Sequence, residues 1–167
     1  HYSSRRQRQM CIRDRILTLY PEVFPGLLGQ GLYGKAMSQK LWSLNVVNIR
    51  DAAEDKHKTV DDTPYGGGSG MLLKADVVAN SIDQNVKKGE RVIYLSPKGK
   101  KFDQKLAQDL SKEKSFSLIC GHFEGVDERV LSTRNIEEIS IGDYILSGGE
   151  TACLLYTSDA ADDWSSG

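Results

Sequence analysis

Three glycine-containing segments carry the residue types best suited to hold a flat, polar ligand. They are LSPKG at residues 95–99, CGHFEG at residues 120–125 and IGDYILSGGE at residues 141–150. Glycine lets a backbone approach a ligand closely, an aromatic ring offers an apolar face, and a carboxylate accepts hydrogen bonds from hydroxyl or amino groups. The third segment, with its density of glycine and aromatic residues, suits backbone recognition of an adenine or a ribose. For the first two segments an ordinary structural turn is the alternative.

A fourth segment, residues 50–71, combines mixed charge with the glycine run GGGSG. The run lacks the Gly-Lys-Ser/Thr ending of a phosphate-binding loop, and no GxGxxG pattern follows an expected strand, which disfavours the usual nucleotide sites. A solvated loop and a flexible linker remain alternatives for this segment. His122 could act as a base or a ligand, although no cysteine cluster or second histidine lies near it in the sequence.

The pattern between these segments is an alternation of short apolar runs and helical periodicity, which predicts an α/β fold with a mostly parallel sheet. We expect strands at residues 16–19, 45–49, 91–95, 116–120 and 138–141. Helices are expected at residues 21–28, 33–41, 75–88, 103–111 and 126–131. The three ligand-binding segments follow expected strands directly, and in parallel α/β sheets ligands bind at that edge.

Composition limits the class of protein. With 167 residues, 39% of them hydrophobic, the chain suits one globular domain. Lys plus Arg (22) balances Asp plus Glu (23), so any contact with RNA must come from a local patch. The three cysteines form no metal-binding spacing, and no metal site is expected. No apolar run is long enough to span a bilayer, and we expect a cytoplasmic protein.

The two ends differ from the rest of the chain. Residues 1–15 hold five arginines, and the end of the chain is small, acidic and rich in serine. MCIRDR and LLYTSDAADD resemble translated adapter sequence, so we interpret residues 1–15 and 153–167 as foreign or disordered tails. An RNA-binding arm is the alternative for the basic end. The expected domain is therefore residues 16–152.

Five motifs together resemble the bacterial tRNA (guanine-N1)-methyltransferases, members of the SPOUT class. They are LYPEVF (19–24), RDxxxDxHxxVDDxPYGGGxGM (50–71), IYLSPKG (93–99), CGHFEGVDERV (120–130) and SIGDYILSGGE (140–150). They occur in the family's order across about 135 residues. Two departures are His122-Phe123, where the family often has Arg-Tyr, and Ser69, where it often has Pro.

The resemblance implies a trefoil-knotted SPOUT domain, S-adenosylmethionine as cofactor, and a homodimer with each active site at the subunit interface. The implied reaction is methylation of N1 of the guanosine at tRNA position 37, next to the anticodon. By motif match, the cofactor-binding residues are Tyr94, Leu95, Ser96, Pro97, Gly121, Glu124, Ser140, Ile141, Gly142, Tyr144, Leu146, Gly148 and Gly149.

The same match assigns residues to RNA binding, namely Arg50, Asp51, Asp55, His57, Asp61, Tyr65, Gly66, Gly67, Gly68 and Gly70. No catalytic residue is assigned, because the family's aspartate base and its arginine partner lie beyond the matched region. We therefore expect an inactive fragment with an incomplete knot and without the C-terminal tRNA-binding domain. The alternatives are a natural short form that binds RNA or a partner, and a SPOUT enzyme with another target nucleotide.

Overall fold

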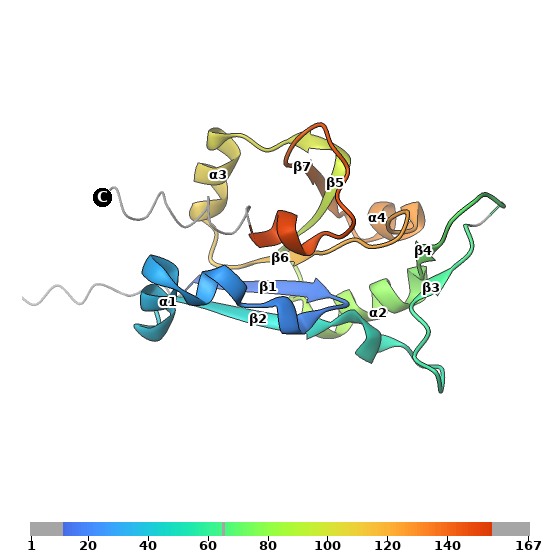
Figure 1. Ribbon diagram of the computed structural model, residues 1–167, viewed down its shortest axis with the longest axis horizontal. Helices are drawn as coiled ribbons and strands as arrows, with labels where there is room; N and C mark the ends of the chain where they lie inside the picture. The colour runs from blue at the N-terminus through green and yellow to red at the C-terminus, as the bar shows by residue number, and fades with distance from the viewer. Residues whose placement is uncertain (1–11, 65, 155–167) are drawn as a thin grey trace, which may run out of the picture.

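A five-stranded parallel sheet forms the centre of the protein (Figure 1). The computed structural model describes residues 12–64 and 66–154. The strand order is β2-β1-β6-β5-β7, and every neighbouring pair is parallel, which confirms the predicted α/β class with a mostly parallel sheet. The strands are β1 (Ile12–Thr18), β2 (Trp42–Asn48), β5 (Arg91–Lys101), β6 (Phe116–Ile119) and β7 (Glu137–Ser140).

Helices cover both faces of this sheet. One face packs against α2 (Ala75–Asn85), α4 (Glu128–Thr133) and the 3-10 helix η3 (Ile49–Ala52). The other face packs against α3 (Gln104–Ser111) and a helical turn at residues 150–154. Two 3-10 helices, η1 (Pro21–Val23) and η2 (Gly26–Gly29), and the helix α1 (Gly31–Ser38) join β1 to β2. No helix in the described ranges is long and apolar enough to cross a membrane.

Alternation along the strands explains the two apolar layers. Successive side chains of a strand point to opposite faces. In β1, Ile16 packs in the layer below α3, whereas Leu17 packs in the layer with α2 and α4. Leu118 and Ile119 of β6 alternate in the same way. The central strands are therefore buried on both faces, as expected for a parallel sheet.

The segment at residues 96–99, predicted as a turn that ends a strand, is a bulge inside β5. Leu95 and Lys100 both lie opposite Ile139 of β7, so the four residues between them project out of the ladder. The strand then continues to Lys101, which pairs with Ser140. The predicted end of this strand at residue 95 is wrong, because pairing with β7 resumes after the bulge.

Other boundaries shift by a few residues. β1 begins at Ile12, before the expected residue 16, because residues 12–15 pair with β2 from Trp42 onward. The helix expected at 75–88 ends at Asn85, and the helix expected at 126–131 runs from Glu128 to Thr133. Residues 21–28 form two 3-10 helices, since Pro25 interrupts any continuous α-helix there.

Candidate functional site

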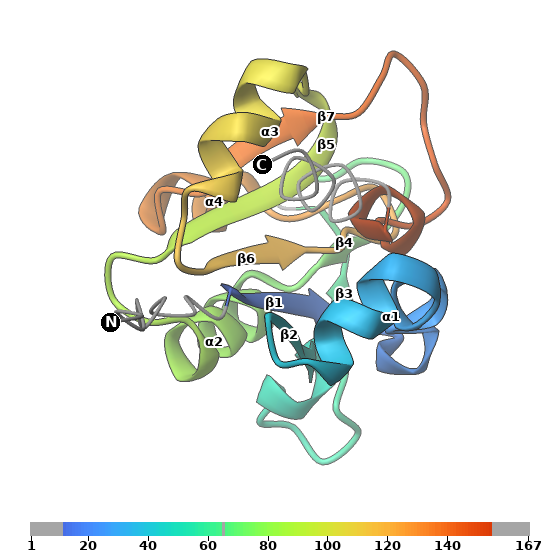
Figure 2. The same ribbon diagram turned by 90° about the vertical axis from the view of Figure 1, so that its left-hand side faces the viewer.

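Three loops leave the same edge of the sheet. We name them loop A (residues 96–99), loop B (residues 121–125) and loop C (residues 141–149). Loops B and C follow β6 and β7, and loop A is the bulge near the carboxyl end of β5. Strand β5 lies between β6 and β7 and is parallel to both, so these ends lie side by side. Figure 2 shows the arrowheads of β1, β6 and β7 pointing toward this edge. The structure thus brings the three predicted segments together.

Tyr94 forms the floor below loop B. Its buried ring lies so close to Gly121 that a Cβ there would sit 2.6 Å from the ring, and a Cβ at Gly125 would lie 3.0 Å from the hydroxyl. Burial raises the pKa of the Tyr94 phenol, and a backbone hydrogen bond with Val126 opposes part of that rise. The phenol therefore acts here as a neutral packing and hydrogen-bonding group.

Loop A presents mainly backbone. Tyr94 and Leu95 pack in the apolar layers on opposite faces of the sheet, so their side chains cannot both face one ligand. Only their backbone atoms can contribute together to the ligand-facing surface of the loops. Ser96 is buried and its Oγ accepts from the backbone N–H of Lys98 at 3.2 Å, while Pro97 is exposed. A Cβ at Gly99 would overlap the backbone of Glu138 and Ile139, so the glycine allows the bulge to lie against β7.

Loop C combines exposed apolar side chains with backbone amides that have no partner in the described part of the chain. Ser140 Oγ donates to the carbonyl of Gly142 at 2.9 Å, which fixes the start of the loop. Within the described ranges, the backbone amides of residues 143–148 have no hydrogen-bond partner. Tyr144 and Leu146 are 51% and 40% exposed. Ile141, beside Ser140, is partly buried in the layer with α3.

Loops B and C meet at two glycines. The backbone N–H of Gly149 donates to the carbonyl of Gly121 at 2.9 Å, and a Cβ at Gly149 would lie 2.7 Å from the Cα of Cys120. Behind them the buried thiols of Cys120 and Cys153 are 3.0 Å apart. Burial, and then the hydrogen bond with Cys153, raises the pKa of the Cys120 thiol, so this thiol is neutral and unreactive at neutral pH.

A buried polar cluster beside these glycines includes Thr18 and Glu150, for which the sequence suggested no role. Nε2 of His122 lies 2.8 Å from both carboxylate oxygens of Glu150, and Thr18 Oγ1 donates to Glu150 Oε1 at 2.5 Å. The ring of Tyr20 meets the ring of His122 edge-on, with 5.0 Å between centroids. Nε2 of His122 is therefore engaged by protein. No spacing in the sequence signals this contact, because Glu150 and His122 are 28 positions apart.

The glycine run of the proposed RNA-binding set forms the tip of a hairpin. β3 (Asp61–Asp62) pairs antiparallel with β4 (Leu72–Leu73). Glycines 66, 67, 68 and 70 have φ angles of 93°, 87°, 144° and 97°, a region that favours glycine. Tyr65 lies outside the described residues.

The hairpin docks onto loop B. The backbone N–H of Glu124 donates to the carbonyl of Met71, and that of Leu73 donates to the carbonyl of Gly125, both at 2.9 Å. A Cβ at Gly70 would overlap the Glu124 side chain. The structure thus joins part of the RNA-binding set to part of the cofactor-binding set, with Glu124 at the junction.

The other RNA-binding candidates form a separate loop that hydrogen-bonds within itself. The guanidinium of Arg50 donates to the carbonyl of Lys58 at 3.2 Å, and Lys58 pairs with Asp51 at 3.2 Å. The Asp55 carboxylate accepts from the backbone and side chain of Thr59, and the backbone bond is the main reason that its pKa is lowered. These side chains and that of His57 are exposed.

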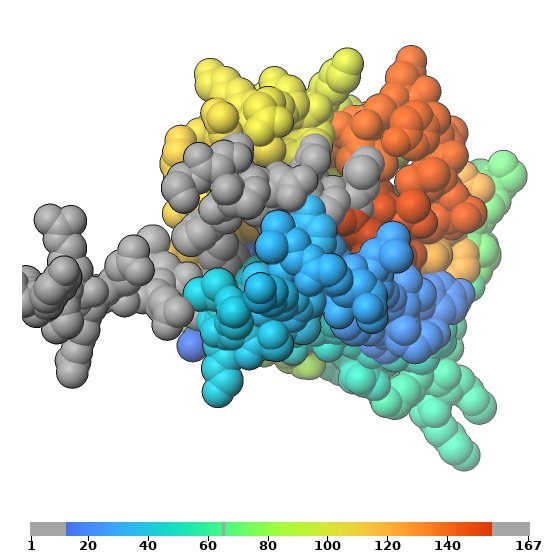
Figure 3. Space-filling model, turned by 60° about the vertical axis from the view of Figure 1, so that its left-hand side comes forward, coloured from blue at the N-terminus to red at the C-terminus, as the bar shows by residue number. Residues whose placement is uncertain are grey.

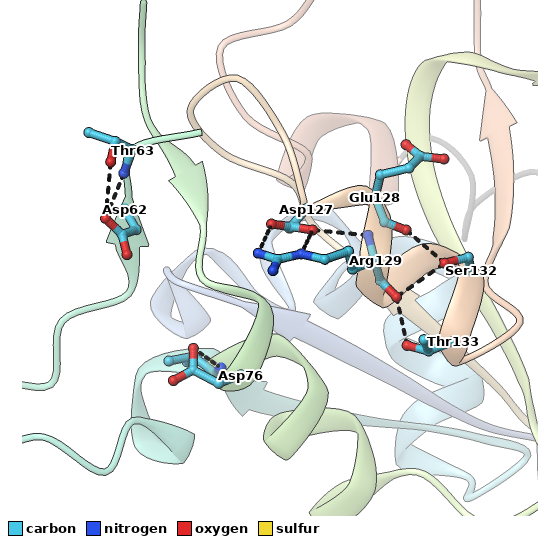
Figure 4. Close-up of polar contacts among 9 residues, drawn as sticks. Asp62, Thr63, Asp76, Asp127, Glu128, Arg129, Ser132 and Thr133 are labelled. Atoms are coloured by element: carbon cyan, nitrogen blue, oxygen red, sulfur yellow. Dashed lines mark hydrogen bonds and ion pairs between the residues drawn. The ribbon is translucent and has the colours of Figure 1, made fainter. Parts of the chain in front are cut away.

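Figure 4 shows the first turn of α4 facing the hairpin. The guanidinium of Arg129 turns back onto Asp127, with Nη2 2.7 Å from Oδ2, and Asp127 also caps the helix by accepting from the backbone N–H of Arg129. The side-chain hydrogen bond from Arg129 is the main cause of the lowered pKa of Asp127. On the hairpin, Asp62 accepts from the backbone N–H of Thr63 at 2.7 Å.

The chain matches a family model described as "tRNA (Guanine-1)-methyltransferase TrmD" over residues 12–161. The chain belongs to this family. A relative from Pelagibacter ubique, described as tRNA (guanine-N(1)-)-methyltransferase, is 75% identical over 141 residues, which cover 84% of this chain and 62% of the relative. Relatives of the same description from Bartonella tribocorum and Wolbachia pipientis are 54% and 51% identical, and each match covers 87% of this chain.

The chain spans 62% to 64% of the length of these relatives. Family membership confirms the resemblance inferred from the five motifs. The roles assigned to single cofactor-binding and RNA-binding residues stay predictions. The geometry of loops A, B and C is the basis for the proposed function.

Proposed function

We propose that this chain is the cofactor-binding part of an enzyme that uses S-adenosylmethionine to methylate N1 of guanosine 37 in tRNA. Membership of the tRNA (guanine-1)-methyltransferase family supports the reaction class. One observation carries the cofactor site: loops A, B and C meet at one sheet edge, and loop C offers there backbone amides that have no partner among the described residues, beside exposed apolar side chains.

This arrangement suits an adenosine with a charged tail. Exposed Tyr144 and Leu146 would cover the apolar faces of the adenine, while backbone amides of residues 143–148 would donate to its ring nitrogens. Glu124, exposed at the end of loop B, provides a carboxylate for a hydroxyl or amino group. Ser96, Gly99 and Gly121 would contribute backbone on the opposite side, since the Ser96 side chain is buried and the two glycines have none.

The chemistry requires positioning and removal of a proton. When bound, S-adenosylmethionine supplies a methyl group on a positively charged sulfur. N1 of guanine carries a proton at neutral pH, so a base must accept that proton as the new bond to N1 forms. The loops would hold the methyl group close to N1, which lowers the entropic cost of the transfer. We assign the base to no residue of this chain.

The target guanosine would approach along the hairpin, since Gly70 and Glu124 join the hairpin to loop B.

We further propose a cytoplasmic homodimer whose subunits share each site. A trefoil knot is also part of the proposal. Its support is the close passage of loop C against Cys120 and of Leu154 against η2. Figure 3 shows the red end of the described chain beside the blue segment between β1 and β2.

Calorimetric titration of the protein with S-adenosylmethionine tests the cofactor site. We expect binding in the wild type, and weaker binding by about tenfold in Leu146→Ala, since removal of a buried contact of this size costs about 1 to 2 kcal/mol. Leu27→Ala is the matched control, because Leu27 is exposed on η2, outside loop C. Equal affinity of the two variants would place the cofactor elsewhere.

A further inference from the structure

The carboxylate of Glu150 links three segments that are far apart in the sequence. Glu150 opens the helical turn after loop C, His122 belongs to loop B, and Thr18 ends β1. Oε1 accepts from Thr18 Oγ1 at 2.5 Å, and both oxygens lie 2.8 Å from His122 Nε2. The Glu150 and His122 side chains are only 10% and 14% exposed.

A carboxylate this deeply buried depends on its partners, because burial without hydrogen bonds disfavours a charge. The other titratable groups nearby are the thiols of Cys120 and Cys153 and the phenol of Tyr20. In the described part of the chain, the imidazole of His122 is the group beside Glu150 that can carry a positive charge. The hydrogen bonds from Thr18 and His122 together fix the orientation of the Glu150 side chain.

Loop C passes against this pair without free space. A Cβ at Gly148 would lie 2.6 Å from Cε1 of His122 and 2.8 Å from Oε2 of Glu150. The next residue, Gly149, donates its backbone N–H to the carbonyl of Gly121 at 2.9 Å. A shift of the imidazole or of the carboxylate toward Gly148 would therefore press on loop C next to its hydrogen bond with loop B.

We propose that Glu150 is a positioning residue, which holds loops B and C in the relative position that the cofactor requires. This inference rests on the proposed function of the loops. Both carboxylate oxygens are engaged by protein groups, so Glu150 would act through His122 and the end of loop C rather than by binding the ligand. Thr18 anchors the same carboxylate to the central strand β1 and gives the two loops a fixed reference.

The first experiment compares Glu150→Ala with a buried ion pair away from the site. Glu90→Ala is the matched control, since the Glu90 side chain is 3% exposed and lies 2.6 Å from Arg15. We measure the thermal midpoint of unfolding and the Kd for S-adenosylmethionine. Both variants should lose stability, but only Glu150→Ala should raise Kd, by about tenfold, the size typical when a support of a ligand-binding residue is removed.

The second experiment needs no cofactor. Amide hydrogen exchange at Gly149, followed by NMR in the ligand-free protein, should accelerate by about tenfold more in Glu150→Ala than in Glu90→Ala, because opening of the loop exposes this amide. If Glu150→Ala does not fold, Glu150→Gln and His122→Ala replace it. His122→Arg should retain slow exchange, since a guanidinium also pairs with a carboxylate.

The two experiments separate the two claims. A wild-type protein that binds no S-adenosylmethionine would remove the proposed function, while exchange at Gly149 would still decide the role of Glu150. Equal acceleration at Gly149 in Glu150→Ala and Glu90→Ala, or an unchanged Kd in Glu150→Ala, would overturn the positioning role.

Discussion

Replacement of Asp14 by asparagine should remove a large part of the pH dependence of stability. Asp14 lies on β1 with 4% of its surface exposed. Trp42 Nε1 donates to its Oδ2 at 2.8 Å, but Oδ1 has no partner among the described residues. Burial raises the pKa of this carboxyl group to about 7, opposed by the Trp42 hydrogen bond and assisted by the charge of Glu90.

The size and sign of the effect follow from this pKa. The unfolded chain releases the proton near pH 3.8, whereas the folded protein retains it up to about pH 7. The free energy of unfolding therefore falls as pH rises between these values and is level above them. Each pKa unit corresponds to about 1.4 kcal/mol, so the full loss is about 4 kcal/mol, of which about 3 kcal/mol falls between pH 5 and pH 8.

Urea unfolding at pH 5, 6.5 and 8 measures this effect. Asparagine keeps an oxygen for Trp42 and carries no charge, so Asp14→Asn should gain stability relative to wild type as pH rises. Asp109→Asn is the control, because Asp109 is exposed and its pair with Lys112 contributes little. A difference between Asp14→Asn and wild type that is constant from pH 5 to pH 8 would refute the reasoning.

Three further predictions concern the core, the bulge and the reaction. Ile93→Ala should lower the free energy of unfolding in urea by about 2 to 5 kcal/mol, since Ile93 is fully buried; a loss below about 1 kcal/mol would contradict its central place. Gly99→Ala should cost about 1 to 3 kcal/mol in the same assay, because its Cβ would overlap β7, and no loss would argue against that close approach. The 167-residue polypeptide should bind cofactor but transfer no labelled methyl group to tRNA, with the Pelagibacter ubique relative as positive control. Transfer above background would show that the polypeptide contains a base for the N1 proton.

The common edge of the three loops is predictable from the sequence. Apolar runs that alternate with helical periodicity predict parallel strands, and parallel strands place the loops that follow them at one edge. Gly121 follows the buried strand β6 and Gly149 ends loop C, and both permit the close contact that the structure shows. The glycines at positions 66, 67, 68 and 70 have positive φ angles, a conformation that glycine adopts more readily than other residues.

The continuation of β5 beyond residue 95 was not predictable. Pro97 and Gly99 are typical turn residues, and local preference favours the end of a strand there. The strand resumes because Lys100 and Lys101 pair with β7, about 40 residues further along the chain. Similarly, Arg13, Asp14 and Arg15 show no apolar alternation, and only pairing with β2 extends β1 to include them.

The link between His122 and Glu150 was also hidden. The two residues are 28 positions apart, and neither lies in a spacing that predicts a contact. Their meeting depends on the return of loop C over the end of β6, which is a property of the tertiary fold. Sequence periodicity predicts which residues of one helix or strand lie on the same face. This pair instead joins loop B to the helical turn that follows loop C.

The order of the strands also bears on when the site can form during synthesis. β1 is synthesised first, and its partner β6 follows about 100 residues later. Glu150, the hydrogen-bond partner of Thr18, is synthesised 132 residues after Thr18. At about 5 to 20 residues per second, that delay is roughly 7 to 26 s on the ribosome. Until β6 is made, about 100 residues after β1, one edge of β1 has no strand beside it, a condition that favours wrong pairing between nascent chains. Chaperone protection during translation would therefore matter most for the segment that later supports the loops.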